Sequence, residues 1–179
     1  METSSKIQPR EVTLYPAILK LFRKQPHAFI EVPYHGKRVD LVFSTREMRY
    51  LYAVEVKIFD WRRAIKQAAL NQLFAQLSYV AMPESIISRF VDRHLELFRR
   101  HHLGLISVSD TEATIAVQAV RNGFLNLNQY RSVKMRLKAA NASLVPKEIG
   151  VLTNAIADRS RSLDHLQAWT SERERALQA

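Results

Sequence analysis

Residues 39–58 read VDLVFSTREMRYLYAVEVKI, two apolar runs rich in β-branched and aromatic residues, separated by a short polar and basic segment. This pattern predicts two buried strands joined as a hairpin. Charged residues interrupt both runs, because Asp40 lies in the first and Glu55 and Lys57 lie in the second. Since side chains alternate between the faces of a strand, Glu55 and Lys57 point the same way. The hairpin then places Asp40 alongside Glu55, so two carboxylates and a lysine converge at one end of a small sheet.

Buried charges of this kind are costly unless they pair with one another or bind a metal ion. In one interpretation, Asp40 and Glu55 hold Mg²⁺, which prefers carboxylate, water and phosphate oxygens and can polarise a phosphodiester. Lys57 would orient or deprotonate the attacking water and offset charge on the phosphate. In the other interpretation, a carboxylate–lysine ion pair only fixes the register of the strands. The strand pattern by itself does not separate the two.

A helix is predicted after the second strand, because Asp60 is a favourable N-cap and apolar residues recur at helical spacing from Trp61 onwards. Asp40, a spacer of fourteen residues, Glu55-x-Lys57 and a following helix that carries Gln67 together resemble the layout of the PD-(D/E)xK nuclease superfamily. The phrase AVEVKIFDWRRAIKQAA, residues 53–69, is similar to bacterial members whose helix after the E-x-K strand begins with D-W-R. The resemblance spans about residues 11–120, and a valine precedes Asp40 where the family's literal motif has proline.

The resemblance implies a role for each motif residue. Asp40 and Glu55 would bind the metal together with the backbone carbonyl of Val56, Lys57 would activate water, and Gln67 would position water or phosphate. The implied activity is that of a Mg²⁺-dependent DNA endonuclease, in which Mn²⁺ may substitute. The alternatives are a ribonuclease and a nucleic-acid-binding accessory protein of the same fold that does not cut. For Gln67, an ordinary solvated helix residue is the competing interpretation.

A fourth acidic residue is implied by the many members that add a glutamate from the first helix. Glu11, at the start of the first predicted helix, is the candidate for this metal ligand, and Glu31 is its rival. A glutamate at the start of a helix also simply favours the helix dipole, so Glu11 has a structural interpretation as well.

The charge of the chain agrees with a nucleic-acid partner, DNA ahead of RNA. The 27 Lys and Arg residues outnumber 17 Asp and Glu, giving a net charge of +10 and a pI of about 10.1. Residues 121–147 hold six basic residues and no acid, which favours a phosphate-contacting surface, although any one of them alone is an ordinary surface cation. The cations predicted to bind nucleic acid are Arg62, Arg63, Lys66, Arg131, Lys134, Arg136 and Lys138.

The order of predicted elements indicates an α/β fold, a mixed central sheet flanked by helices with the restriction-endonuclease-like αβββαβ core. The expected helices cover about 12–24, 60–76 and 84–101, and the expected strands cover about 28–34, 38–44, 51–58, 78–82, 105–108 and 114–120. Residues 1–120 would form the nuclease-like core, 121–145 a basic connecting segment and 146–179 a C-terminal helical extension. That last helix either packs back on the core or forms a homodimer.

Several classes of protein are disfavoured by what the sequence lacks. It has no cysteine, its four glycines form no phosphate-binding loop, and its six histidines show no metal-ligand spacing. No apolar run approaches the length of a membrane span, and the N-terminus has no apolar signal segment. These features favour a cytoplasmic protein without a membrane partner.

Overall fold

The computed structural model describes the backbone of residues 11–143, and the side chains of these residues except 90–93 and 141–143. The helix predicted for 146–179 lies outside the described residues. The elements in chain order are the 3-10 helix η1 (Glu11–Leu14), α1 (Tyr15–Leu21), β1 (His27–Tyr34), β2 (Lys37–Ser44), β3 (Leu51–Val56), α2 (Trp61–Asn71), β4 (Leu77–Pro83), α3 (Glu84–Arg100), β5 (Gly104–Val108), β6 (Ala113–Val117) and α4 (Leu127–Ser143).

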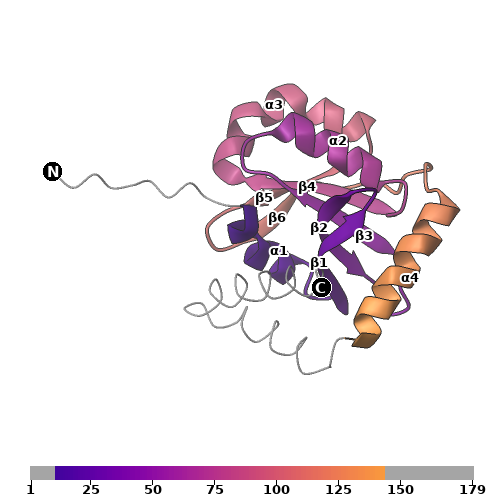
Figure 1. Ribbon diagram of the computed structural model, residues 1–179. Helices are drawn as coiled ribbons and strands as arrows, with labels where there is room; N and C mark the ends of the chain where they lie inside the picture. The colour runs from indigo at the N-terminus through magenta and orange to yellow at the C-terminus, as the bar shows by residue number, and fades with distance from the viewer. Residues whose placement is uncertain (1–10, 144–179) are drawn as a thin grey trace. The chain divides into compact units, whose positions relative to one another are not determined.

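The six strands form one mixed sheet in the order β1-β2-β3-β4-β5-β6, so each strand lies beside its neighbours in sequence (Figure 1). Strands β1, β2 and β3 form an antiparallel meander, and β5 and β6 form an antiparallel hairpin. Strand β4 is parallel to both β3 and β5. Parallel neighbours need a crossover connection, which α2 and α3 supply. The predicted α/β class with a mixed sheet flanked by helices is confirmed.

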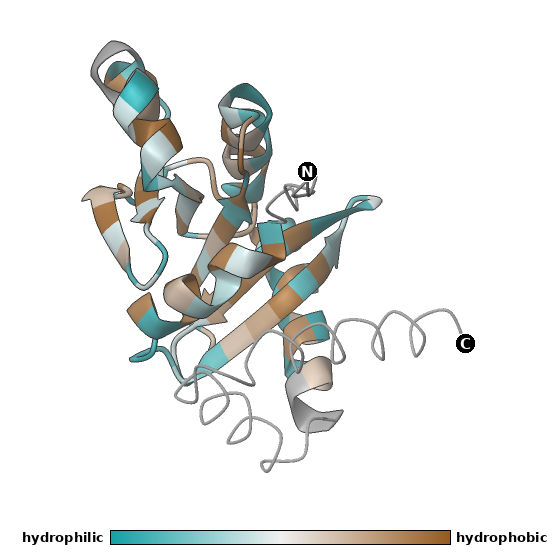
Figure 2. Cartoon of the chain, turned by 90° about the vertical axis from the view of Figure 1, so that its left-hand side faces the viewer, coloured by the Kyte–Doolittle hydropathy of each residue, from teal (hydrophilic) through white to brown (hydrophobic). Residues whose placement is uncertain are grey.

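Helices cover both faces of the sheet. Adjacent residues of β4 point to opposite faces: Val80 packs in a buried cluster with α2 and α3 residues such as Ala68 and Phe98. On the other face, Phe22 at the end of α1 lies 5.8 Å from the Tyr79 ring, centroid to centroid. Figure 2 shows that the strands through the middle of the sheet are mostly apolar and that hydrophilic residues gather at the turns.

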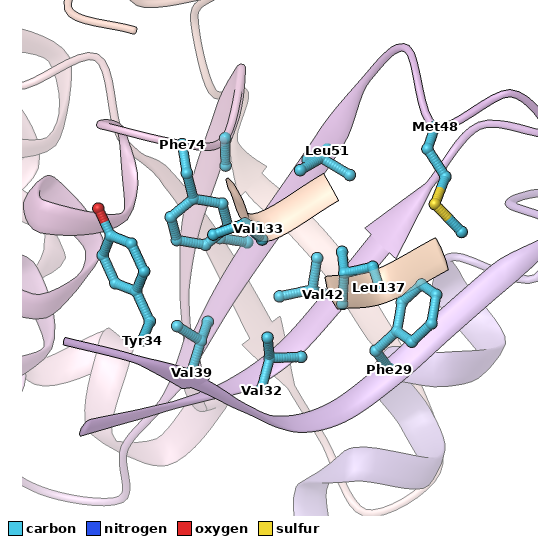
Figure 3. Close-up of a cluster of buried hydrophobic side chains, with 12 residues drawn as sticks. Phe29, Val32, Tyr34, Val39, Val42, Met48, Leu51, Phe74, Val133 and Leu137 are labelled. Carbon is cyan, nitrogen blue, oxygen red and sulfur yellow. The ribbon is translucent and has the colours of Figure 1, made fainter. Parts of the chain in front are cut away.

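Helix α4 falls in the segment that we expected to be a basic connection. Its residues Val133 and Leu137 join a buried cluster over the β1–β3 meander, together with Val42, Leu51 and Phe74 (Figure 3). Residues up to Leu137 belong to one compact unit. The structure therefore places residues 121–137 with the sheet, past the boundary predicted at residue 120.

Two helices end earlier than the sequence pattern predicts. Helix α1 ends at Leu21, and α2 ends at Asn71 rather than near residue 76. After α2 the chain continues in a tight turn, in which the backbone N–H of Phe74 donates to the Asn71 carbonyl. This turn drives the fully buried Phe74 ring into the cluster below α4, which a continued helix would not do. No helix of the described part of the chain is long and apolar enough to cross a membrane.

Candidate active site at the open end of the β2–β3 hairpin

The pairing of β1 with β2 is interrupted where the candidate site begins. The two strands pair at Ile30↔Leu41 and at Val32↔Val39, but not at Glu31 and Asp40 between them. Glu31 has φ of 53°, a left-handed conformation that costs a residue with a side chain on the order of 1–2 kcal/mol. Such outliers persist where the surrounding structure enforces them, often at functional sites.

Asp40 is directed across the sheet to β3. Its Oδ2 accepts a hydrogen bond of 2.7 Å from the backbone N–H of Val56. The regular β2–β3 register stops at Leu41↔Val54, so the Asp40 carboxylate satisfies a backbone donor beyond the last regular pair. This contact fixes the carboxylate at the carboxyl end of β3.

Lys57 lies directly after β3 and turns its ammonium toward the same point. Its Nζ lies 3.7 Å from Asp40 Oδ2 and 2.9 Å from Glu11 Oε2, and it donates to the Val56 carbonyl oxygen at 2.8 Å. The side chains of Lys57 and Asp40 are only 12% and 11% exposed, so these two charges interact with little screening by water, whereas Glu11 is 41% exposed. The convergence of Lys57 with Asp40 that the sequence predicts is therefore observed, and it includes Glu11.

Glu55 is almost completely buried, at 2% exposure. Its Oε1 accepts a 2.7 Å hydrogen bond from Asn71 Nδ2 of α2. Its Oε2 accepts from no donor among the described residues, but the neighbouring Asp40 carboxyl is near enough to share a hydrogen bond with the protonated form of Glu55. Asn71 is a site residue that we did not assign from the sequence. The available signal was a polar residue one helical turn after Gln67 on the same face, and this signal does not distinguish a buried amide from a solvated one.

The carboxyl groups of Asp40 and Glu55 both have pKa values above their ordinary range. Burial raises the pKa of Asp40 to about 6, although the Lys57 charge and the Val56 N–H lower it. Burial and the neighbouring Asp40 raise the pKa of Glu55 to about 8, against the lowering effect of the Asn71 hydrogen bond. Because the ionised forms are disfavoured by burial and by like charge, a bound cation would stabilise both carboxylates.

Lys57 and Tyr15 both remain protonated donors near neutral pH. Burial alone would lower the pKa of Lys57, but Asp40, Glu11 and Glu55 outweigh this effect and raise it above its ordinary value. Burial and the charges of Asp40 and Glu31 raise the pKa of the Tyr15 hydroxyl far above its usual range. Tyr15 donates a 3.0 Å hydrogen bond to Glu31 Oε1, which holds that glutamate beside the site.

Two further residues predicted for the site, Glu11 and Gln67, make different contacts. Glu11 is ion-paired with Lys57 rather than directed at the other acids. Gln67 lies one turn before Asn71 on α2, and its buried Oε1 has no partner among the described residues. No group of three or more His, Asp or Glu side chains in the described part of the chain has the arrangement of a complete metal site. Two carboxylates and a carbonyl are nevertheless compatible with Mg²⁺, which usually retains several waters.

The predicted nucleic-acid-binding cations lie on two helices. Arg62, Arg63 and Lys66 are exposed on the first two turns of α2, which begins four residues after Lys57. On α4, Arg131, Arg136 and Lys138 are exposed and Lys134 is half-buried. Arg136 donates to the Pro33 carbonyl at 3.1 Å, so it has a structural contact of its own.

Comparisons with known proteins find a similar fold but give no information on the activity. No protein-family model matches the chain, and no curated protein matches it. Among solved structures, the chain is similar to a protein of unknown function from Silicibacter pomeroyi, at 18% identity and a TM-score of 0.56. The match covers 76% of this chain and 88% of that one. At this identity the likeness concerns the fold alone.

Proposed function

We propose that the protein is a metal-dependent nuclease of the PD-(D/E)xK type, with its active site at Asp40, Glu55 and Lys57. The observation that carries the proposal is the distance of 3.7 Å between Lys57 Nζ, just after β3, and Asp40 Oδ2 of β2. Glu55 lies two residues before Lys57, in β3. The αβββαβ order of the first elements, from α1 to β4, supports it, since this is the order that the motif resemblance implies.

The competing interpretation, a structural ion pair, accounts for less of the geometry. An ion pair that only held the strands in register would satisfy both of its carboxylates. Here two buried carboxyl groups lie beside each other, and the pKa of Glu55 is raised to about 8 by burial and by the neighbouring Asp40. A second buried acid adds nothing to an Asp40–Lys57 ion pair and disfavours the ionised form of both carboxyl groups. Binding of a cation between the two acids explains why both are present.

The donor set fits a hard divalent cation. Asp40, Glu55 and the Val56 carbonyl would hold Mg²⁺, with Mn²⁺ as a substitute, and Glu31 and Glu11 are both close enough to Asp40 to raise its pKa. When bound, the ion supplies Lewis-acid polarisation of the scissile phosphate and acidifies a bound water. Glu11 then has a different role from the one implied by the resemblance, because its carboxylate positions the Lys57 ammonium at 2.9 Å.

Lys57 acts as a charged hydrogen-bond donor in this proposal. Since its pKa is raised, it remains an ammonium at neutral pH and does not serve as the base that deprotonates water. It orients the attacking water and stabilises the negative charge that develops on the phosphate oxygens. The unpartnered Gln67 Oε1 is a candidate acceptor for a proton of that water.

DNA is the proposed substrate, because the chain carries a net charge of +10 and exposed cations follow the site on α2. Electrostatic attraction to phosphate does not distinguish DNA from RNA. Ribonuclease activity and binding without cleavage are therefore the two alternatives that an experiment has to separate.

The test is incubation of the full chain with duplex, single-stranded and branched DNA and with RNA. Each substrate is offered with Mg²⁺, with Mn²⁺ and with EDTA. The proposal expects cleavage of DNA that requires a divalent ion and that is lost in Asp40→Ala. Metal-dependent cleavage of RNA alone would assign a ribonuclease. Binding without cleavage of any of these substrates would replace the proposal by the accessory-protein alternative.

A further inference from the structure

A second surface of the molecule combines aromatic rings and cations away from the candidate active site. It consists of Tyr50, Arg121, Tyr130 and Lys134, which we call the Tyr50 platform. The Arg121 guanidinium lies over the Tyr50 ring at 5.6 Å, and Lys134 Nζ lies over the Tyr130 ring at 5.5 Å. Tyr50 is 40% exposed although Arg121 lies over one side of its ring, so part of its surface is open to a ligand.

Hydrogen bonds join the two halves of the platform. The Tyr130 hydroxyl donates to the backbone carbonyls of Met48 and Arg49, at 2.9 and 3.1 Å. Arg49 directly precedes Tyr50 in the chain, so Tyr130 is held within about one peptide unit of the Tyr50 backbone. The turn between β2 and β3 and the first turns of α4 therefore present their rings and cations as one surface.

Buried amides fix the backbone below this surface. Gln76 accepts from the Leu51 N–H at 2.7 Å and donates to the Arg49 carbonyl at 3.2 Å, so it bonds both peptide groups that flank Tyr50. Asn122 donates to the Ala75 carbonyl at 2.9 Å and anchors the residue after Arg121. Gln76 and Asn122 are 5% and 6% exposed. Satisfied buried amides rigidify a structure, so Tyr50 and Arg121 are held in place before any ligand arrives.

The charge of the platform is positive. Arg121 and Lys134 are not ion-paired with any described acid, whereas the neighbouring Arg49 is paired with Glu47 at 2.6 Å. The anchored segment also presents Phe124, whose side chain is 68% exposed. An exposed ring flanked by unpaired cations offers a base a stacking partner and offers the adjoining phosphates a counter-charge.

We propose that the Tyr50 platform binds single-stranded nucleic acid, with a base stacked on Tyr50 and phosphates on Arg121 and Lys134. Single strands fit because their unpaired bases expose the π-face that stacking requires. Tyr50 directly precedes β3 and lies five residues before Glu55. Binding at the platform does not depend on cleavage at the candidate active site.

The experiment measures binding in EDTA, so that cleavage plays no part and failure of the nuclease proposal stays distinguishable. Fluorescence anisotropy follows labelled oligo(dT), oligo(rU) and a DNA duplex of the same length across a salt series. The variants are Tyr50→Ala, Tyr50→Phe, Arg121→Gln and Lys134→Gln, and Lys24→Gln is a charge-matched control at an exposed position. Thermal unfolding of each variant checks that the fold is retained.

Tyr50→Ala is expected to weaken single-strand binding by about fivefold to 150-fold, because one base stacked on a ring contributes about 1–3 kcal/mol. Tyr50→Phe retains the affinity. Arg121→Gln and Lys134→Gln each reduce the slope of log K against log salt by about 0.7 for a single strand, and Lys24→Gln leaves it unchanged. Similar affinity for oligo(dT) and oligo(rU) is expected, because stacking and phosphate contacts are shared by the two. Undiminished binding by Tyr50→Ala, or tighter binding of the duplex than of the single strand, would overturn the proposal.

Discussion

Glu55 is the residue whose environment is hardest to explain without a cation. Its pKa of about 8 in the folded chain exceeds the ordinary value of 4.5 because of burial and the nearby Asp40. Between these two pH values the folded chain binds more protons than the unfolded chain, so the free energy of unfolding falls as the pH rises. The metal-free protein should therefore lose stability across this window.

Glu55→Gln tests this linkage. The amide oxygen can still accept from Asn71, but the side chain no longer ionises. We expect the variant and the wild type to be similarly stable near pH 4.5, and the variant to be more stable by on the order of a few kcal/mol near pH 9. Urea unfolding in EDTA measures the difference, and Glu84→Gln, at an exposed position, is the matched control. A stability gap that does not widen with pH would contradict the assigned environment.

Lys57 provides a second test, because its substitution should slow cleavage without weakening metal binding. Lys57→Ala removes the donor that contacts Asp40, Glu11 and the Val56 carbonyl but leaves the three proposed metal ligands. Mn²⁺ affinity, measured by calorimetry, should be retained, whereas single-turnover cleavage should fall about a hundredfold or more, as for other charge-stabilising donors. Lys24→Ala should change neither quantity. Cleavage by Lys57→Ala at the wild-type rate would remove Lys57 from the mechanism.

At the scale of the elements, the strands follow the sequence closely and α4 does not. Apolar runs bounded by turn residues predict β1, β2, β4 and β5 to within one residue at each end, because burial on a sheet dictates composition directly. Strands β3 and β6 end two and three residues earlier than predicted, at Val56 and Val117. Among the described side chains of α4, Val133 and Leu137 are buried in the cluster over β1–β3 and Tyr130 packs against it. Most of the others are polar, basic or exposed, and the pattern is too weak to predict a packed helix.

The packing of α4 gives a prediction of its own. Leu137 is 3% exposed within the cluster over β1–β3, whereas Met135 on the same helix is 71% exposed. Leu137→Ala should lower the free energy of unfolding by about 2–4 kcal/mol, because it leaves a cavity. Met135→Ala should change it by less than about 0.5 kcal/mol. Urea unfolding distinguishes the two, and equal small effects would show that α4 is not part of the core.

For the whole molecule, the sequence predicts the class of the sheet and the three charged residues that meet on it. Asp40, Glu55 and Lys57 stand out because charges in apolar strands are rare. The left-handed Glu31, the Asn71 contact and the pairing of Glu11 with Lys57 are set by tertiary structure. Local patterns in the sequence do not carry this information. The Tyr50 platform likewise joins two segments, residues 48–50 and 121–134, that are far apart in the chain.

We propose that the acids at the open end of the β2–β3 hairpin support metal-dependent hydrolysis of phosphodiesters. The most direct measurement is single-turnover cleavage of DNA in Mg²⁺ by the wild type, Asp40→Asn and Glu84→Gln, with nucleic-acid binding measured in parallel. Asp40→Asn removes one charge and hardly any volume. We expect Asp40→Asn to bind DNA like the wild type but to cleave it at least a hundredfold more slowly, and we expect Glu84→Gln to cleave normally. Equal cleavage by all three proteins would show that Asp40 takes no part in a metal-dependent cleavage reaction.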